Sequence, residues 1–242
     1  MNTGTPTAAI GAPRKANDGP LPPLLLILTV VTGLVDAVSY LELGHVFVAN
    51  MTGNVVFLGF AVAGAPGLSI PASLAAIGAF LAGALGGGRL GFRLAGHRGR
   101  LLAMASYIKL ALVGTALVVS AVGQSVDDDA VRYALIALLA VAMGLQNAAV
   151  RRLAVSDLTT TVLTLTLTGV AADSVLAGGT NPNIGRRLTA VAAMFGGAAV
   201  GALLIRYVGV SAVLALTLAL LAGNSVAAYR MSSSIDAWTR PS

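Results

Sequence analysis

The chain has 242 residues, of which 57% are hydrophobic and only 10% are charged. This composition excludes a soluble globular protein, because too little polar surface would remain to cover a fold of this size. The formal net charge of +6 does not indicate nucleic-acid binding, since the arginines stand in short stretches between apolar runs and not on one amphipathic face. The absence of cysteine excludes disulfides and thiolate metal sites. We therefore expect an all-α integral membrane protein.

Eight apolar segments follow one another between two polar tails. Residues 1–20 are rich in Pro, Gly, Thr and Ala without a cleavage site behind an apolar core, which predicts a disordered tail and not a signal peptide. Residues 231–242 form a second polar tail, so a single membrane domain is expected over residues 21–230. Runs of about 20 apolar residues can cross a bilayer as helices. The segments lie at 22–44, 46–64, 70–90, 101–122, 131–150, 158–177, 188–207 and 209–229.

The first segment carries an acid deep in its apolar run. At such a depth a charged side chain costs on the order of 3 kcal/mol unless it is paired, hydrated or protonated. Thr32, Gly33, Asp36 and Tyr40 recur at helical spacing, so this face is predicted to look into the bundle. Asp36 is a candidate proton or cation site that lines a polar cavity. The alternative is a structural acid tied to another helix, with Lys109 as a possible partner.

The second segment, "VFVANMTGNVVFLGF", has polar residues in its middle. Asn50 and Asn54 are four positions apart and would share one face of a helix, with Thr52 beside them. Gly53 is the position at which such a helix would most readily unwind. These residues are predicted to line a solute or ion pathway, and the alternative is that they serve helix packing.

The chain contains an internal repeat. "GLVDA" begins at Gly33 and "GLQNA" at Gly144, 111 positions later, and the small-residue pair Gly83 and Gly87 recurs as Gly197 and Gly201 after 114 positions. Such pairs allow membrane helices to approach closely. The chain is therefore predicted to consist of two copies of one four-segment unit, at about 22–122 and 131–229.

The second copy keeps polar groups at the corresponding places but not the acid. Gln146 and Asn147 stand where the first copy has Val35 and Asp36, and they are interpreted either as solute contacts or as interhelical hydrogen bonds. A threonine stripe in "TTTVLTLTLTG" is the counterpart of "NMTGN" and is a second candidate pathway lining, although threonine can also bond its own i−4 carbonyl. The stripe consists of Thr160, Thr164 and Thr168.

The distribution of charge predicts how many segments cross the membrane. Eight crossings would place a basic loop outside and the triple Asp inside, against the usual bias toward basic cytoplasmic loops. If the second and sixth segments are re-entrant or broken, six spans place nearly every basic stretch inside and Asp127–Asp129 outside. Each copy then has three crossings, so the copies are inverted relative to each other. Seven or eight spans remain the alternative.

Two strings, Gly33–Gly59 and Gly144–Ser174, resemble the YoaK-like family of bacterial integral membrane proteins. In relatives the Thr-rich segment has the form Thr-Thr-x-x-Thr-Gly-Thr, whereas Leu165 stands at the glycine position here and favours a continuous helix. The resemblance implies a multi-pass bacterial membrane protein of about six spans and implies no activity. The motifs that carry it are Gly33, Asp36 and Ala37, Phe47 with Asn50, Thr52–Asn54, and Gly144–Ala148 with Arg151.

These patterns favour a small-solute or ion-coupled secondary transporter in the bacterial inner membrane, with a cytoplasmic N-terminus and a polar site at the midplane. The alternative is a membrane scaffold or assembly partner whose polar groups are structural. An enzyme is not expected, because no hydrolase or metal-enzyme motif occurs. We expect no metal and no other cofactor. The expected partners are the lipid bilayer and an unidentified small solute or ion, with a homodimer as the alternative to a monomer.

Overall fold

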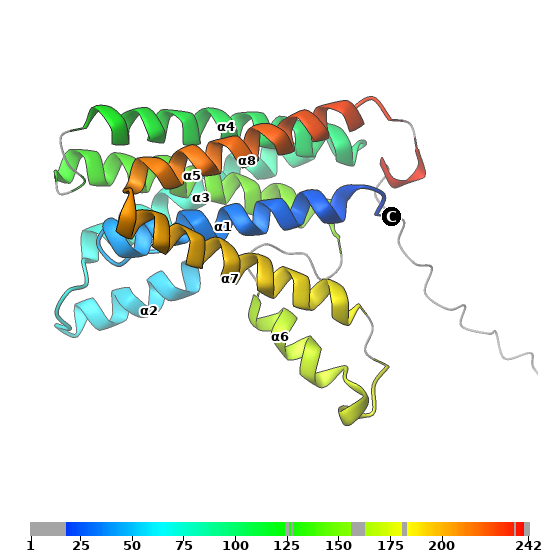
Figure 1. The fold of residues 1–242 in the computed structure, drawn as a ribbon, viewed down its shortest axis with the longest axis horizontal. Helices are drawn as coiled ribbons and strands as arrows, with labels where there is room; N and C mark the ends of the chain where they lie inside the picture. The colour runs from blue at the N-terminus through cyan, green and yellow to red at the C-terminus, as the bar shows by residue number, and fades with distance from the viewer. Residues whose placement is uncertain are drawn as a thin grey trace, which may run out of the picture.

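The computed structural model describes residues 18–123, 126, 128–155, 163–180, 183–234 and 236–239. Figure 1 shows these residues as long helices gathered in one bundle. Six of the described helices are long and apolar enough to cross a bilayer: α1 (Leu21–Glu42), α3 (Ile70–Arg93), α4 (Arg98–Val122), α5 (Asp129–Leu153), α7 (Ile184–Tyr207) and α8 (Val210–Met231). The shorter elements are α2 (Met51–Val62), α6 (Leu163–Ala172) and the 3-10 turns η1 (Val175–Ala177) and η2 (Ala237–Thr239).

The first and last described residues meet at one end of the bundle. Asp18 forms ion pairs with Arg98 at the start of α4, at 3.3 Å, and with Arg186 near the start of α7, at 2.9 Å. Arg98 also donates to the backbone carbonyls of Leu153 at the end of α5 and Trp238 in η2. We call this the terminal end and the opposite end the far end. The helices α1, α4 and α7 begin at the terminal end, and α3, α5 and α8 run back to it.

The short helices α2 and α6 each reach through only about half of a bilayer. With 12 and 10 residues they are roughly 18 and 15 Å long, against a hydrocarbon core of about 30 Å. A short loop joins the end of α2 to the start of α3 at the far end. The end of α6 is held at the terminal end, where Arg187 donates to the carbonyl of Gly169 at 2.6 Å and pairs with Asp173 at 2.7 Å. Each short helix therefore begins partway along the length of the bundle, and the two run in opposite directions (Figure 1).

Two helix pairs approach so closely that only glycine fits between them. A Cβ added at Gly83 of α3 would overlap with the backbone carbonyl of Val141 on α5, and one added at Gly197 of α7 would overlap with that of Val30 on α1. Close backbone approach through small residues is the usual way in which membrane helices pack. Other helices of the same chain cover these glycines, so the glycines offer no face to a second copy. The buried members of the two predicted small-residue pairs are Gly83, Gly87, Gly197 and Gly201.

The neighbours of each helix follow one pattern in both halves of the chain. The helix α1 packs against α7 and α8, and α5 packs against α3 and α4. The short helices α2 and α6 pack against α3 and α7, respectively, while α4 and α8 contact each other. If each helix from α1 to α4 is replaced by its counterpart from α5 to α8, and the reverse, the same set of helix neighbours results.

Candidate functional site

A cavity of about 820 Å³, the central cavity, lies where both short helices begin. The non-helical approach to α2 and its first turn form one wall, and the first turn of α6 forms another. Phe80 of α3 and Met194 of α7 complete it beside α1. The predicted pathway residues that line the central cavity are Asp36, Asn50, Thr52, Gly53 and Thr164.

Asp36 faces the central cavity from α1 and is held by the chain that leads into α2. Its Oδ1 accepts a hydrogen bond from the backbone N–H of Ala49 at 3.1 Å, and the residue is 5% exposed. The predicted alternative of a pair with Lys109 does not form, since Lys109 bonds to Gln146 instead. Among the described residues, no three His, Asp or Glu side chains are grouped as metal ligands. Of the described residues that line the cavity, Asp36 is the single acid, and it bonds to backbone and not to a cation.

The chain enters the bundle through a turn that follows α1. Gly44 and His45 have φ values of 90° and 56°, which reverse the chain after Glu42. The residues that follow return beside α1 until Ala49 reaches Asp36, and α2 begins at Met51. The helical interruption therefore precedes α2. Gly53, the predicted point of unwinding, lies inside the helix.

Asn54 fixes this loop and does not line the central cavity. Its fully buried side chain accepts from the backbone N–H of Phe47 at 2.8 Å and donates to the carbonyl of Phe47 at 2.5 Å. A Cβ at Gly53 would lie 2.8 Å from the Phe47 ring, so glycine makes room for that ring. Tyr40 stacks on the same ring with centroids 5.1 Å apart. The structure thus places Asn54 and Tyr40 in the support of the loop, away from the predicted pathway.

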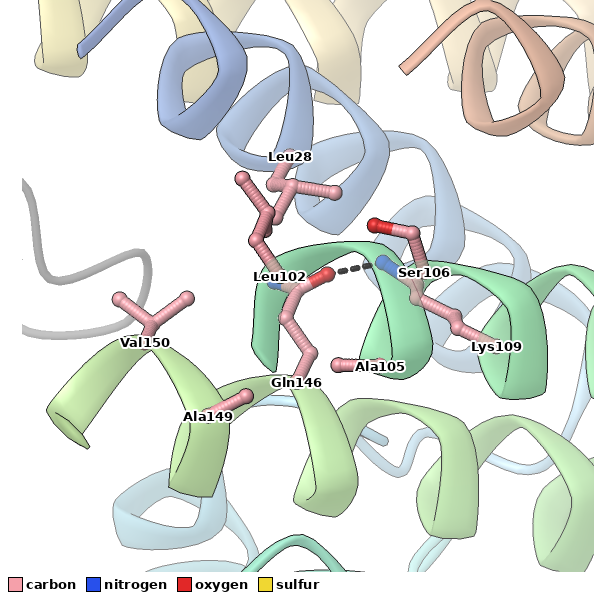
Figure 2. Close-up of a pocket in the computed structure, with 8 residues that line it drawn as sticks. All are labelled: Leu28, Leu102, Ala105, Ser106, Lys109, Gln146, Ala149 and Val150. Atoms are coloured by element: carbon pink, nitrogen blue, oxygen red, sulfur yellow. Dashed lines mark hydrogen bonds between the residues drawn. The ribbon is translucent and has the colours of Figure 1, made fainter. Parts of the chain in front are cut away.

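A polar chain connects three spans beside the central cavity. Lys109 of α4 donates from Nζ to Oε1 of Gln146 on α5, among apolar neighbours such as Leu28, as Figure 2 shows. Gln146 donates from Nε2 to Thr32 of α1 at 3.1 Å, and Thr32 lines the central cavity. Gln146 is therefore an interhelical link, one of its two predicted roles. The role of Lys109 is not evident from the sequence, although a lysine inside an apolar segment signals a need for a buried partner.

Asn147 lines a second cavity of about 620 Å³, the basic cavity, which lies toward the terminal end. Arg151 and Arg152, from the last turn of α5, line it as well. Its opposite wall comes from α3 and includes Phe80, which also lines the central cavity. The predicted pair Gln146 and Asn147 is thus divided, because adjacent residues on a helix point in different directions.

The threonine stripe is also divided. Thr164 lines the central cavity, but Thr168 is exposed and donates to the carbonyl of Thr164 at 2.8 Å. Such i−4 bonding was the predicted alternative to pathway lining. The helix α6 continues through Leu165, which is 70% exposed. Thr160, the first residue of the predicted stripe, lies outside the described residues.

Comparisons with known proteins identify related sequences. The sequence model of the family described as "Protein of unknown function (DUF1275)" matches residues 24–227, from the first turn of α1 to the last turns of α8. The UPF0700 transmembrane protein YoaK of Bacillus subtilis (strain 168) is 34% identical over 151 residues, which are 62% of this chain. The match covers 65% of that relative's length. No solved structure matches the chain.

Proposed function

The chain belongs to the DUF1275 family of membrane proteins, in agreement with its YoaK-like motifs, and from its own geometry we propose that it is a small secondary transporter. The observation that carries this proposal is the central cavity, at which two half-length helices begin beside a membrane-embedded acid. Interrupted helices that meet near the midplane are a recurring design of transporter binding sites. The solute would bind in this cavity.

An inverted repeat is part of the proposal, and the helix neighbours support it. A Cβ at Gly33 of α1 would lie 2.7 Å from the backbone nitrogen of Ala198 on α7, and one at Gly144 of α5 would lie 2.8 Å from that of Ala84 on α3. These two contacts correspond after shifts of 111 and 114 positions. Because α1 begins at the terminal end and α5 at the far end, the two copies would have opposite orientations, as in many alternating-access transporters.

The start of α2 suits a polar solute. Its N-cap residue, Asn50, makes no side-chain capping bond, while the first turn of α2 lines the central cavity. The first N–H groups of a helix have no intrahelical partner and carry the positive end of its dipole. Asp36, on the same cavity, would bind the coupling proton or cation. Phe80, which lines both the central cavity and the basic cavity, would be the gate between them.

We propose that the terminal end faces the cytoplasm of a bacterium, so that the N-terminus is cytoplasmic in the inner membrane. Short cytoplasmic loops of membrane proteins are enriched in Lys and Arg. Acids at the far end include Glu42, Asp128 and Asp129. The basic residues at the terminal end are Arg89, Arg93, Arg98, Arg100, Arg151, Arg152, Arg186, Arg187 and Arg230.

Flux measurements test the transport function. Purified protein is reconstituted into vesicles that contain a pH-sensitive dye, and sodium, phosphate and small carboxylates are added in turn. We expect at least one of them to produce protein-dependent flux that is lost in Asp36→Asn and retained in Thr168→Ala, which changes an exposed hydroxyl away from the cavity. Equal flux in Asp36→Asn and the parent protein would remove Asp36 from the mechanism.

Cysteine labelling distinguishes a silent transporter from a scaffold, since the chain has no native cysteine. Met194 lines the central cavity, whereas its neighbour Phe195 is 75% exposed on the outer surface of the bundle. A charged thiol reagent is expected to modify Met194→Cys but not Phe195→Cys, because lipid excludes water from the latter. No flux for any solute together with no labelling of Met194→Cys would favour the scaffold.

A further inference from the structure

The basic cavity has a chemistry opposite to that of the central cavity. It is lined by two arginines and an amide, and no acid belongs to its lining among the described residues. We propose that the basic cavity binds an oxyanion, meaning a phosphate, sulfate or carboxylate group. The proposal does not depend on transport, because such a group could bind in a protein that moves no solute.

The two arginines differ from three other arginines at the terminal end. Arg98, Arg186 and Arg187 each form an ion pair with an aspartate. Within the described part of the chain, Arg151 and Arg152 form no ion pair, although both line a cavity large enough for a small anion. Guanidinium groups match the geometry of carboxylate and phosphate oxygens, with which they form paired hydrogen bonds.

The α3 helix holds Arg152 in position. Its guanidinium lies over the ring of Phe92, 3.9 Å from the centroid. A Cβ at Gly91 would lie 2.9 Å from Cγ of Arg152, so glycine lets the arginine stem lie against the α3 backbone. Stacking occupies the face of a guanidinium and leaves its edge N–H donors free for an anion. Arg152 is therefore ordered before any anion arrives, which lowers the entropic cost of binding.

The position of the arginines at a helix end does not by itself balance their charge. Arg151 and Arg152 lie in the last turn of α5, where the helix dipole favours cations. The dipole supplies only about half of an elementary negative charge, against two full positive charges that share one cavity. Both side chains are exposed, so water screens part of the remainder, and an oxyanion in the cavity would balance the rest. The amide of Asn147 in the same lining could donate to it.

The oxyanion could come from either of two sources. The basic cavity lies at the terminal end of α5, where a candidate membrane span ends, so the phosphate of an anionic lipid could enter it. A free anion could enter from the water. Both sources would present the same kind of oxygen atoms to Arg151 and Arg152. The lipid composition used in the experiment distinguishes the two sources.

Binding of radiolabelled inorganic phosphate to the protein in phosphatidylcholine nanodiscs tests the free source. We expect saturable binding that weakens about tenfold or more in Arg151→Gln, since one charge-assisted interaction is lost. Arg230→Gln is the matched control, because it removes an exposed arginine of the terminal end that lines neither cavity. Asn147→Asp, which adds a negative charge to the cavity, should weaken binding as well and covers the case in which Arg151→Gln fails to fold.

Nanodiscs that contain phosphatidylglycerol test the lipid source, with retained lipid counted by mass spectrometry of the intact protein. Retention that is lost in Arg151→Gln but kept in Arg230→Gln would support the oxyanion site with lipid as its source, even without binding of free phosphate. If neither phosphate nor phosphatidylglycerol binds in an Arg151-dependent manner to the folded protein, the proposal is overturned.

Discussion

The first four helices and the last four have the same neighbours but different polar side chains. Asp36 of α1 lies on the central cavity, while Asn147, 111 positions later on α5, lies on the basic cavity. Lys109 is buried in α4, and Leu221, 112 positions later, is equally buried in α8. The halves therefore share a pattern of helix neighbours but differ in chemistry: Asp36 and the buried Lys109 belong to the first half.

This difference has a physical reason. Helix pairs that touch through glycine require close backbone approach at a few positions in both halves, and no larger residue fits there. A side chain that faces a cavity meets no such constraint, so its charge can differ between the halves without disturbing the packing. Changes at the glycines should consequently affect both halves alike, and changes at polar positions should affect only one.

The largest effect is expected for valine at the glycine contacts. Gly33→Val and Gly144→Val should each lower the free energy of unfolding by more than about 3 kcal/mol, because the added atoms would overlap with backbone and not with a flexible side chain. Thermal unfolding in detergent, followed by size-exclusion chromatography, measures the loss.

Gly86→Val and Gly196→Val are the matched controls, since nothing lies within 4 Å of a Cβ at either position. They should change stability far less. A Gly33→Val protein as stable as its parent, beside an unfolded Gly144→Val protein, would show that the two halves are not equivalent even in their packing.

A smaller effect, confined to one polar chain, is expected for Gln146→Leu. This change leaves the Nζ of buried Lys109 without the bond to Gln146 and should cost about 3 kcal/mol, because removal of one partner leaves a buried charge uncompensated. Lys109→Leu, which gives α4 the residue found at position 221 of α8, should recover most of that loss when it is combined with Gln146→Leu. Chemical unfolding of the two single variants and the double variant measures the coupling.

Additive effects of the two changes would contradict the link between Lys109 and Gln146. Leu221→Met, a change of similar volume at the corresponding buried position of α8, serves as the control. It should cost less than about 1.5 kcal/mol.

The smallest effect is expected where Asn54 holds the loop before α2. Asn54→Ala removes both hydrogen bonds to the backbone of Phe47 and should cost about 2 kcal/mol. The change should also speed hydrogen exchange at the Phe47 amide, whose N–H bonds to the Asn54 side chain. Thr168→Ala, in the corresponding short helix of the second half, should stay within about 0.5 kcal/mol because its hydroxyl is exposed. Unchanged exchange at Phe47 in Asn54→Ala would contradict the role of Asn54.

The spans were predictable from the chain because their signal is local. Six apolar runs have enough length and hydropathy to cross a bilayer, and the charge pattern indicated which two segments would not. The depth of Asp36 in its apolar segment could also be predicted from the sequence. The direction in which each polar side chain points could be predicted less well, because a shared face can be deduced only where the backbone is helical throughout.

The segment around Asn50 shows this limit. The spacing of Asn50 and Asn54 predicts one helical face, but α2 begins only at Met51, so Asn50 lines the central cavity while Asn54 turns toward Phe47. No local signal in "VFVANMTGN" distinguishes these two orientations.

By itself, the sequence indicated a helical membrane bundle of about six spans, with polar residues in two short segments and motifs that resemble the YoaK-like family. Hydropathy, length and loop charge act on each segment separately and can be read without knowledge of its neighbours. The tertiary structure alone decided that Asp36 bonds to backbone, that Lys109 bonds to Gln146, and that Arg152 lies over Phe92. These are contacts between segments, and they depend on the rotation and depth of each helix, which packing determines.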